Sequence, residues 1–318
     1  MLIIMVVQNT ATNAALCGAA TGSGLDGEIG VVDHQGRFVW YELLTTDVAA
    51  AKAFYGAVVG WGAQDASTPK LAYGLFIAGT APVSGLMELP DDARKLGATP
   101  RWVGYVGVDD VDQTTDRIKR LGGAVYVPPT DSNIGRISVV ADPQSATLAV
   151  VKGLKPGRQQ PVELGEPGQV GWHELLAANW QTAFAFYREV FDWQQAAPEI
   201  GLMDSYQLIS AGGQTIGGIF TKLPTVPLPF WLYYFNVGDI DVAAERVKSS
   251  GGRVAQGPVE LPDGSWIARC IDPQGAMFAL QGPRNRRDLD QAPVTELAWS
   301  AEWGGITSRG RVVSKPRR

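Results

Sequence analysis

The sequence predicts an α+β protein made of two copies of one domain, each copy built from two β-α-β-β-β units. Three observations predict this: a long internal repeat, an order of strand-like and helix-like segments that recurs four times, and a sufficient length. The 318 residues, 45% of them apolar, can give each of two ordinary domains its own hydrophobic core. A single compact domain is the weaker interpretation.

The internal repeat is the strongest of these observations. The stretch FVWYELLTTDVAAAKAFYGAVVGW at residues 38–61 returns as VGWHELLAANWQTAFAFYREVFDW, which ends at Trp193. The correspondence continues with small slips to the end of the copy, in the pairs Trp40 and Trp172, Glu42 and Glu174, Tyr73 and Tyr206, Gly85 and Gly218, and Asp142 and Asp272. Identities kept in order over such a length indicate a duplication.

The elements of the first unit follow from local patterns. Apolar and polar residues alternate over residues 40–44, which predicts a strand. Asp47 is a natural N-cap for the next helix, Phe54 and Val58 mark its buried side, and Gly60 ends it. Three short strands are expected next, around Gln64, at 73–78 and at 83–89.

The pattern then restarts with a strand at 102–108, a helix at 109–121 and three strands that run to Val151. The second copy repeats this order. We therefore expect five segments: a poorly ordered N-terminal extension (1–36), a first domain (37–155), a Pro-, Gly- and Gln-rich linker (156–168), a second domain (169–283) and a polar, basic C-terminal tail (284–318).

Composition argues against several classes of function. A net charge of -5 gives no electrostatic support for binding nucleic acid or an anionic membrane. Two cysteines, Cys17 and Cys270, exclude a disulfide scaffold and favour a reducing compartment. The apolar start has no preceding Lys or Arg, and no stretch reaches the roughly 20 apolar residues that span a bilayer. We expect a soluble, cytoplasmic protein.

Paired β-α-β-β-β units, an Ala-Phe-Tyr sequence in the first helix of each copy (53–55 and 185–187) and a late Asp-Pro-Gln turn (142–144 and 272–274) resemble the vicinal oxygen chelate superfamily. This superfamily includes glyoxalases, bleomycin-resistance proteins and ring-cleaving dioxygenases. The resemblance implies that each domain curls its sheet around one open cleft. It also implies that the cleft usually holds a divalent metal, bound by His, Gln or Glu on the first and last strands of each unit.

Carried over residue by residue, the family's ligand positions hold no metal-binding side chain. They fall on Trp40, Val103, Ala149 and Met87 in the first copy, and on Trp172, Leu232, Ala279 and Phe220 in the second. Glu88 is one residue off and would face the other way. His34 lies outside the repeat, and His173 points to the opposite face of its strand. Because these positions lack ligands, we expect no metal and no other cofactor. The family's known reactions use that metal, so we do not expect the same mechanisms here.

Alternation along the strands predicts what faces each cleft instead. The candidate catalytic residues are one carboxylate and one phenol per copy: Glu42 and Tyr105 in the first, Glu174 and Tyr234 in the second. The candidate ligand-binding residues are Trp40, Trp172, Asn236, Arg136 and Arg269, together with Trp231 and Trp266, which are included for the aromatic content of their stretches. The alternative is structural: tryptophans and tyrosines that fill a core, and carboxylates satisfied by an arginine or a backbone amide.

Three functions remain open: a metal-independent enzyme of lyase or isomerase type acting on an apolar, aromatic molecule; a protein that binds or sequesters such a molecule; and a metal-dependent glyoxalase-type lyase or dioxygenase. We rank the first two above the third. The second copy has the fuller aromatic set and is predicted to bind a planar ligand more tightly. Four units already supply two clefts, so we expect a monomer or a weak homodimer.

Overall fold

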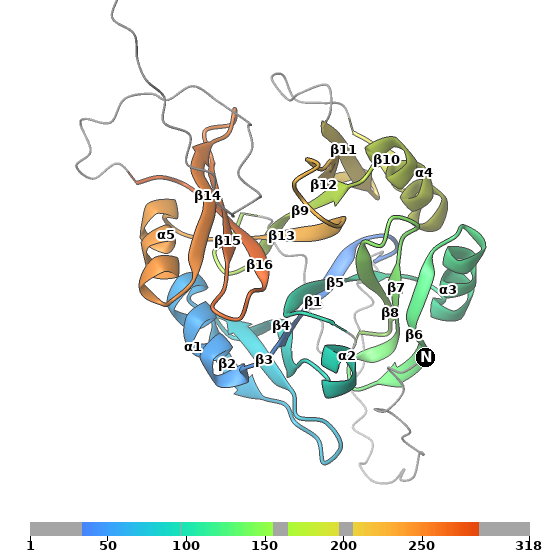
Figure 1. Ribbon diagram of the computed structural model, residues 1–318, viewed down its shortest axis with the longest axis horizontal. Coiled ribbons are helices and arrows are strands. Elements are labelled where there is room, and N and C mark those ends of the chain that lie inside the picture. The colour runs from blue at the N-terminus through green and yellow to red at the C-terminus, as the bar shows by residue number, and fades with distance from the viewer. Residues whose placement is uncertain (1–33, 96, 155–164, 197–205, 286–318) are drawn as a thin grey trace, which may run out of the picture.

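The computed structural model describes residues 34–95, 97–154, 165–196 and 206–285. These residues form two eight-stranded sheets, one from each copy of the repeat (Figure 1). The α+β class with two tandem domains is confirmed. Most of the expected N-terminal extension, most of the linker and nearly all of the C-terminal tail lie outside the described residues.

The first sheet uses residues from Phe38 to Lys152. Its elements are β1 (Phe38–Thr45), α1 (Val48–Val59), β2 (Gly62–Asp65), β3 (Gly74–Ala78), β4 (Ala81–Glu88), α2 (Asp91–Lys95), β5 (Arg101–Gly107), α3 (Val111–Arg120), β6 (Ala124–Ser132), β7 (Gly135–Ala141) and β8 (Thr147–Lys152). The five-residue α2 is an addition to the expected pattern.

The second sheet repeats this order. Its elements are β9 (Val170–Ala177), α4 (Trp180–Phe191), β10 (Gln194–Gln195), β11 (Tyr206–Ala211), β12 (Gln214–Thr221), β13 (Phe230–Asn236), α5 (Ile240–Ser249), β14 (Arg253–Glu260), β15 (Trp266–Ile271) and β16 (Met277–Gly282). The strand orders are β2-β3-β4-β1-β5-β8-β7-β6 and β10-β11-β12-β9-β13-β16-β15-β14. Each copy therefore completes its sheet with its own strands.

Side-chain hydrogen bonds cap the helices where the sequence predicts. Asp47 accepts from the backbone N–H of Ala50 at 2.9 Å, and Asn179 accepts from that of Thr182 at 2.9 Å, so both satisfy an unpaired donor of the first turn. Gly60 ends α1 in the left-handed region at φ 85°. Asp192 takes the same role for α4 at φ 57°, a conformation that Asp tolerates better than most residues.

The two faces of each sheet pack against different groups of side chains. On β1, Tyr41 and Leu43 join a large core, whereas Trp40 joins a separate small cluster on the other side, which we call the inner face. Leu75 on β3 and Ile137 on β7 stand near opposite ends of the strand order, yet both pack against this one cluster. The sheet therefore curls around its inner face, as the family resemblance implies.

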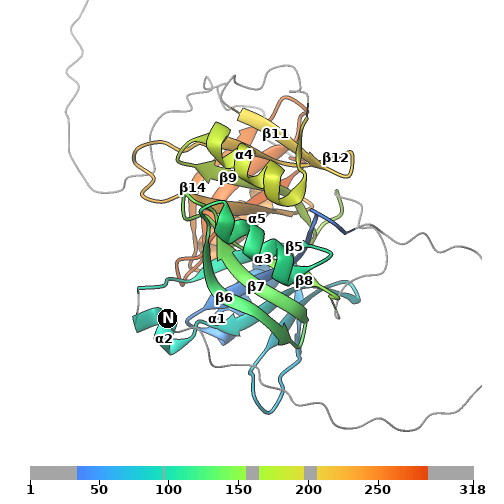
Figure 2. The same ribbon diagram turned by 90° about the vertical axis from the view of Figure 1, so that its right-hand side faces the viewer.

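The opposite faces of the two sheets share one core with the helices. Phe54 of α1 packs edge-on against Phe278 of β16 at 5.8 Å between ring centroids. Helix α1 contacts α5, and α3 contacts α4. Both pairs lie at the boundary between the copies, one in Figure 1 and the other in Figure 2. The two copies thus bury apolar surface against each other, which stabilises both.

Reciprocal hydrogen bonds also join the copies. Trp61 donates its indole N–H to the carbonyl oxygen of Gly168 at 2.8 Å, and Trp193 donates to that of Gly36 at 2.6 Å. A residue two positions before the first strand of each copy is thereby held by the other copy. Among the residues that the structure describes, none of the helices has both the length and the apolar character needed to cross a membrane.

Candidate functional site

The inner face of the first copy has a buried carboxyl group at its centre. Glu42 is 8% exposed, and its Oε2 accepts a hydrogen bond from the Tyr105 hydroxyl at 2.7 Å. A second phenol, that of Tyr73, also hydrogen-bonds to Glu42. Burial raises the pKa of the Glu42 carboxyl above its ordinary value, although these two hydrogen bonds oppose the rise. A buried carboxyl whose pKa is raised takes up a proton more readily than an exposed one.

Tyr73 is a site residue that the sequence reasoning missed. Its hydroxyl also accepts from the indole N–H of Trp40 at 3.3 Å. The phenol fits because Gly85 has no side chain: a Cβ there would stand 2.0 Å from the Tyr73 oxygen and 3.2 Å from Oε1 of Glu42. The internal repeat could have indicated this residue, because both this tyrosine and this glycine recur in the second copy as Tyr206 and Gly218.

The second copy builds the same arrangement. The Tyr234 hydroxyl donates to Oε2 of Glu174 at 2.7 Å, and Trp172 donates its indole N–H to Tyr206 at 2.9 Å. Tyr206 hydrogen-bonds to Glu174 as well. A Cβ on Gly218 would stand 2.2 Å from the Tyr206 ring. The structure therefore brings together all four candidate catalytic residues with their predicted partners.

One further partner distinguishes the second copy. Arg269, 5% exposed, forms an ion pair with Glu174 at 2.6 Å between Nη2 and Oε2. Its Nε lies 3.3 Å from the Tyr234 hydroxyl, and its Nη1 lies 3.1 Å from Oε1 of Gln256. Arg269 thus satisfies the Glu174 carboxylate, as in the structural alternative of a carboxylate satisfied by an arginine.

Apolar side chains surround both carboxyls. Half-buried residues that pack against the first cluster include Leu44, Leu75, Met87, Ile137 and Val139. In the second copy, the half-buried residues are Trp172, Phe220, Phe230, Ile267 and Met277. An apolar surface with one central polar group is typical of sites that bind small organic molecules.

The family's metal positions lie on these inner faces. Trp40, Val103 and Ala149 belong to the first cluster with Met87 packed against it, and Leu232 and Ala279 belong to the second with Trp172 and Phe220. Glu88 is exposed at the end of β4. Indole, aliphatic and thioether groups do not suit a hard or borderline divalent cation. Within the described ranges, no group of three His, Cys, Asp or Glu residues could hold a metal ion. The residues present do not fit the family's metal.

Two expected ligand-binding tryptophans face the wrong way. Trp231 lies in the shared core, where its indole N–H donates to Tyr187 at 3.1 Å. Trp266 packs on the same side, beneath the guanidinium of Arg284 at 3.6 Å from the ring centroid. Both side chains alternate with those of the inner face, and the helix layer covers them. The prediction of a tighter second site was based on the additional aromatic residues of the second copy. Most of these residues therefore lie in the core between the copies.

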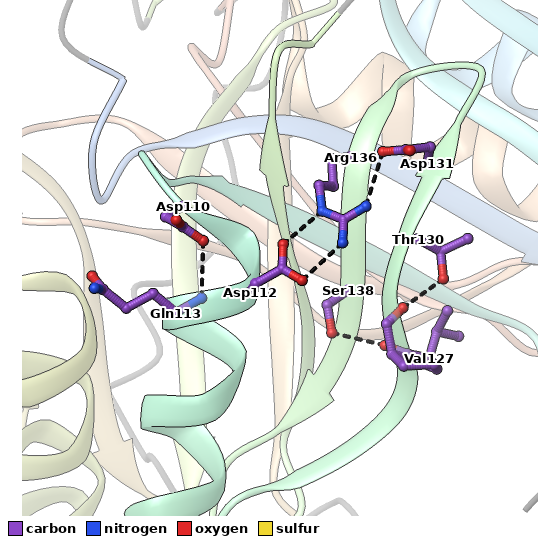
Figure 3. A network of polar contacts seen from close by, with 9 residues as sticks. Asp110, Asp112, Gln113, Val127, Thr130, Asp131, Arg136 and Ser138 are labelled. Carbon is purple, nitrogen blue, oxygen red and sulfur yellow. Dashed lines mark hydrogen bonds and ion pairs between the residues drawn. The ribbon is translucent and has the colours of Figure 1, made fainter. Parts of the chain in front are cut away.

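Arg136 is also not a cleft residue. Its guanidinium donates to both carboxylate oxygens of Asp112 at 2.6 and 2.8 Å and to Asp131 at 3.0 Å (Figure 3). These are ion pairs of a partly exposed surface. In the second copy, Arg284 pairs with Asp241 instead. Arg136 therefore helps to hold α3 against β7 and has no contact with Glu42.

Asn236 lies at the edge of the site, whereas His173 lies in the core. Asn236 is buried at the end of β13, and its amide donates to the carbonyl oxygen of Glu166 at 3.1 Å, which holds the segment before β9. His173 is buried in the core, as alternation predicts, between Tyr41 and the carbonyl oxygen of Ile216. Burial lowers the pKa of His173 to about 4, so its Nδ1–H donates to the carbonyl and its Nε2 accepts from Tyr41.

Two curled sheets, each with a central carboxyl on an apolar inner face, define a tandem protein of the glyoxalase-like class. The chain matches the family model of the Glyoxalase/Bleomycin resistance protein/Dioxygenase superfamily over residues 37–150 and 169–280. The chain belongs to this superfamily, and the resemblance inferred from the sequence is confirmed.

Similar proteins of known name cover most of the chain. A Mycobacterium tuberculosis protein whose name assigns it to the glyoxylases is 33% identical over 254 residues, which are 79% of this chain and 96% of the relative. An anthracycline biosynthesis protein of Streptomyces peucetius is 31% identical over 263 residues, which are 77% and 92% of the two chains.

Two solved structures share the fold. The Mn(II)-bound glyoxalase of Novosphingobium aromaticivorans superimposes with a TM-score of 0.55 at 19% identity, over 81% of this chain and 85% of that one. A 2,3-dioxygenase of Pseudomonas gives a TM-score of 0.55 at 12% identity, over 82% and 97%. At such low identity the comparison establishes architecture alone.

Proposed function

We propose that the protein binds an apolar, planar aromatic molecule on its inner faces and acts on it by proton transfer, without a divalent metal. The observation that carries this proposal is the Glu42 carboxyl, buried among apolar side chains and hydrogen-bonded to Tyr105 and Tyr73. Such a carboxyl can serve as a general acid or base, in a reaction of lyase or isomerase type. The phenols orient it.

The apolar surroundings support an aromatic ligand. Half-buried Leu75, Met87 and Ile137 offer surface that a flat molecule would cover, with a gain of about 25 cal/mol per Å² of apolar area buried. The anthracycline biosynthesis relative points to the same chemical class, because anthracyclines contain fused aromatic rings. The ligand-position residues Trp40, Val103 and Ala149 support metal independence.

The experiment is a titration with a panel of fused-ring hydroxyquinones, 1,8-dihydroxyanthraquinone among them, followed by tryptophan fluorescence. We expect binding that survives treatment with a chelator and is weakened in Leu75→Asp, which places a charge on the apolar rim. The proposal fails if no member of the panel binds. It also fails if isomerisation of a glutathione hemithioacetal appears when Mn²⁺, Ni²⁺ or Zn²⁺ is added.

A second candidate function is sequestration of the same kind of molecule without chemistry. The Glu174–Arg269 ion pair favours it for the second copy, because a carboxylate bonded to a guanidinium suits the binding of polar substituents. Quantitative recovery of the unchanged probe after prolonged incubation would support this alternative.

We also propose two domains over residues 37–155 and 169–283, a monomer or weak homodimer, and a cytoplasmic location. Each copy completes its own sheet, which supports a fold that needs no partner chain. Light scattering at several protein concentrations measures the oligomeric state.

A further inference from the structure

We propose that the two inner faces have divided their roles: the first carries out proton chemistry through Glu42, and the second binds without exchanging a proton, because Arg269 holds Glu174 in a buried ion pair. This inference rests on the proposed function and extends it by naming the residue pair, Val139 and Arg269, that sets the difference.

The two carboxyls occupy equivalent places. Glu42 lies opposite Val103 and Gly85 in the sheet, and Glu174 lies opposite Leu232 and Gly218. Each accepts from one tyrosine of the neighbouring antiparallel strand at 2.7 Å. A difference in behaviour between the copies must therefore come from residues outside this common set.

The distinguishing position is on the penultimate strand. Val139 lies opposite Ala149, and Arg269 lies opposite Ala279, so the two residues stand at the same place in their sheets. Val139 is half-buried beside the first cluster. Arg269 reaches across the inner face and bonds to Glu174, Tyr234 and Gln256. The first copy thus lacks at position 139 the cation that the second copy supplies.

Arg269 and Glu174 each have their counter-charge within a buried ion pair. Both side chains are almost fully buried, at 5% and 4% exposure. Protonation of Glu174 would leave a buried guanidinium without its counter-charge, which is strongly unfavourable. The fixed pair is further held by the phenol of Tyr234.

Around Glu42, the elements packed on the inner face present different chemistry. Strand β5 contributes the phenol of Tyr105, and the residue before β3 contributes that of Tyr73. The cation on this face of β5 is Arg101, which lies opposite Leu44 at the start of the strand and donates its Nε–H to the carbonyl oxygen of Thr99 at 3.0 Å. Strands β4, β7 and β8 present Met87, Val139 and Ala149, which carry no charge. Two phenols that can donate but hold no positive charge leave the carboxyl free to cycle between its acid and its anion.

The proton step follows from this arrangement. The O–H bond of the Glu42 carboxyl breaks, and an O–H bond forms on a carbonyl oxygen of the ligand. The electron pair stays on the carboxylate, to which Tyr105 and Tyr73 then donate. The proton returns to Glu42 from a C–H bond next to that carbonyl, and the electron pair of the C–H bond becomes the C=C bond of an enol. No other reactant is required, which matches an isomerase or lyase reaction.

Infrared difference spectroscopy of the ligand-free, full-length protein tests the titration directly. We expect a protonated-carboxyl C=O band at neutral pH that is lost in Glu42→Gln and retained in Glu174→Gln. Subtracting variant from wild-type spectra separates Glu42 from Asp142 and Asp272, whose pKa values burial also raises. Identical spectra of wild type and Glu42→Gln across the neutral range would overturn the inference.

A second infrared experiment exchanges the residues at the distinguishing position, Val139 and Arg269. Arg269→Val copies the arrangement that the first copy already adopts, so a second protonated-carboxyl band should appear and should vanish in Arg269→Val/Glu174→Gln. Val139→Arg should remove the Glu42 band. If Val139→Arg does not fold, the Arg269→Val result alone decides, and absence of the new band counts against the proposal.

A calorimetric arm separates this inference from the proposed function. Binding of 1,8-dihydroxyanthraquinone, measured in two buffers of different ionisation enthalpy, should show proton exchange that disappears in Glu42→Gln and persists in Glu174→Gln. Failure of the whole hydroxyquinone panel to bind overturns the proposed function while the infrared bands still report the two carboxyls. Binding with proton exchange lost in Glu174→Gln alone overturns the division of roles.

Discussion

At the scale of single residues, two glycines decide where the phenols of the inner faces stand. Gly85→Ala would place a Cβ on the hydroxyl of Tyr73, so the phenol must swing away and lose its hydrogen bonds to Glu42 and Trp40. We expect a loss of about 1–3 kcal/mol of folding free energy, measured by urea denaturation. Gly62→Ala is the control, because its Cβ meets no atom closer than 3.8 Å. Equal stability of the two variants would contradict the assigned role of Gly85.

His173 gives the core a pH-dependent contribution. Its folded pKa of about 4 lies below the value of about 6.5 in an unfolded chain. Below pH 6.5 the unfolded chain therefore takes up a proton that the folded protein does not. Acidification from about pH 6.5 to about pH 4 should thus cost wild type roughly 3 kcal/mol of stability that His173→Gln does not lose.

The check on His173 is the difference between wild-type and His173→Gln unfolding free energies, measured against pH. The difference is needed because the raised pKa values of Glu42, Asp142 and Asp272 act in the opposite direction. Parallel pH profiles for the two proteins would show that His173 becomes protonated in the folded state.

Sequence reasoning reached some of these residues and not others, for a physical reason. Strand alternation correctly placed Glu42 with Tyr105, because neighbouring residues of one strand must face opposite ways. For Trp231 and Trp266 the aromatic content of their strands is a misleading guide, because each tryptophan neighbours an inner-face residue and therefore faces the core. The contact between Arg269 and Glu174 spans 95 positions, and local pattern supplied only a candidate pairing.

At the scale of elements, helices α1 and α4 connect the copies through matching hydrogen bonds. Tyr55 on α1 donates to Asp272 at 3.1 Å, and Tyr187 on α4 donates to Asp142 at 3.0 Å. Each bond joins a helix of one copy to the late Asp-Pro turn of the other. The two turns that the sequence showed as a repeated motif therefore also serve as attachment points between copies.

Removal of one of these hydroxyls tests the connection. Tyr55→Phe leaves a buried oxygen of Asp272 with one donor fewer, and we expect a loss of about 1–3 kcal/mol in chemical denaturation. Tyr187→Phe should behave alike. Tyr126→Phe, at a tyrosine that is 43% exposed, should leave stability unchanged. A comparable loss in all three variants would argue against a special role for the buried pair.

Local sequence patterns could not predict the order of the strands in the sheets. Alternation and caps predicted where strands and helices occur, including the end of α1 at Gly60. The parallel pairing of β1 with β4 and the antiparallel junction of β1 with β5 depend on contacts between distant segments. That arrangement entered the prediction only through the family resemblance.

At the scale of the whole molecule, the shared core makes the two copies one folding unit. Core residues such as Phe54, Tyr187 and Phe278 contact the other copy or the helices between the sheets. A copy without its partner would expose this apolar surface to water, which is unfavourable.

Cutting the linker tests this dependence. A protease site inserted between residues 155 and 164, once cleaved, should leave the two halves associated and eluting as the intact protein of 34.0 kDa. Each half expressed alone should aggregate. Two independent unfolding transitions in the uncut protein, or a soluble isolated half, would show that the copies do not need each other.

The contrast between Val139 and Arg269 also bears on the origin of the molecule. If one half had assembled with an identical second half, every change at this position would have altered both carboxyl sites at once. Joining the two halves in a single gene removes that coupling, so one site can gain a cation while the other keeps its valine. In this protein the duplication has produced sites that can diverge in chemistry. The hydrogen bonds of Trp61 and Trp193 meanwhile still join each half to the segment that precedes the first strand of the other.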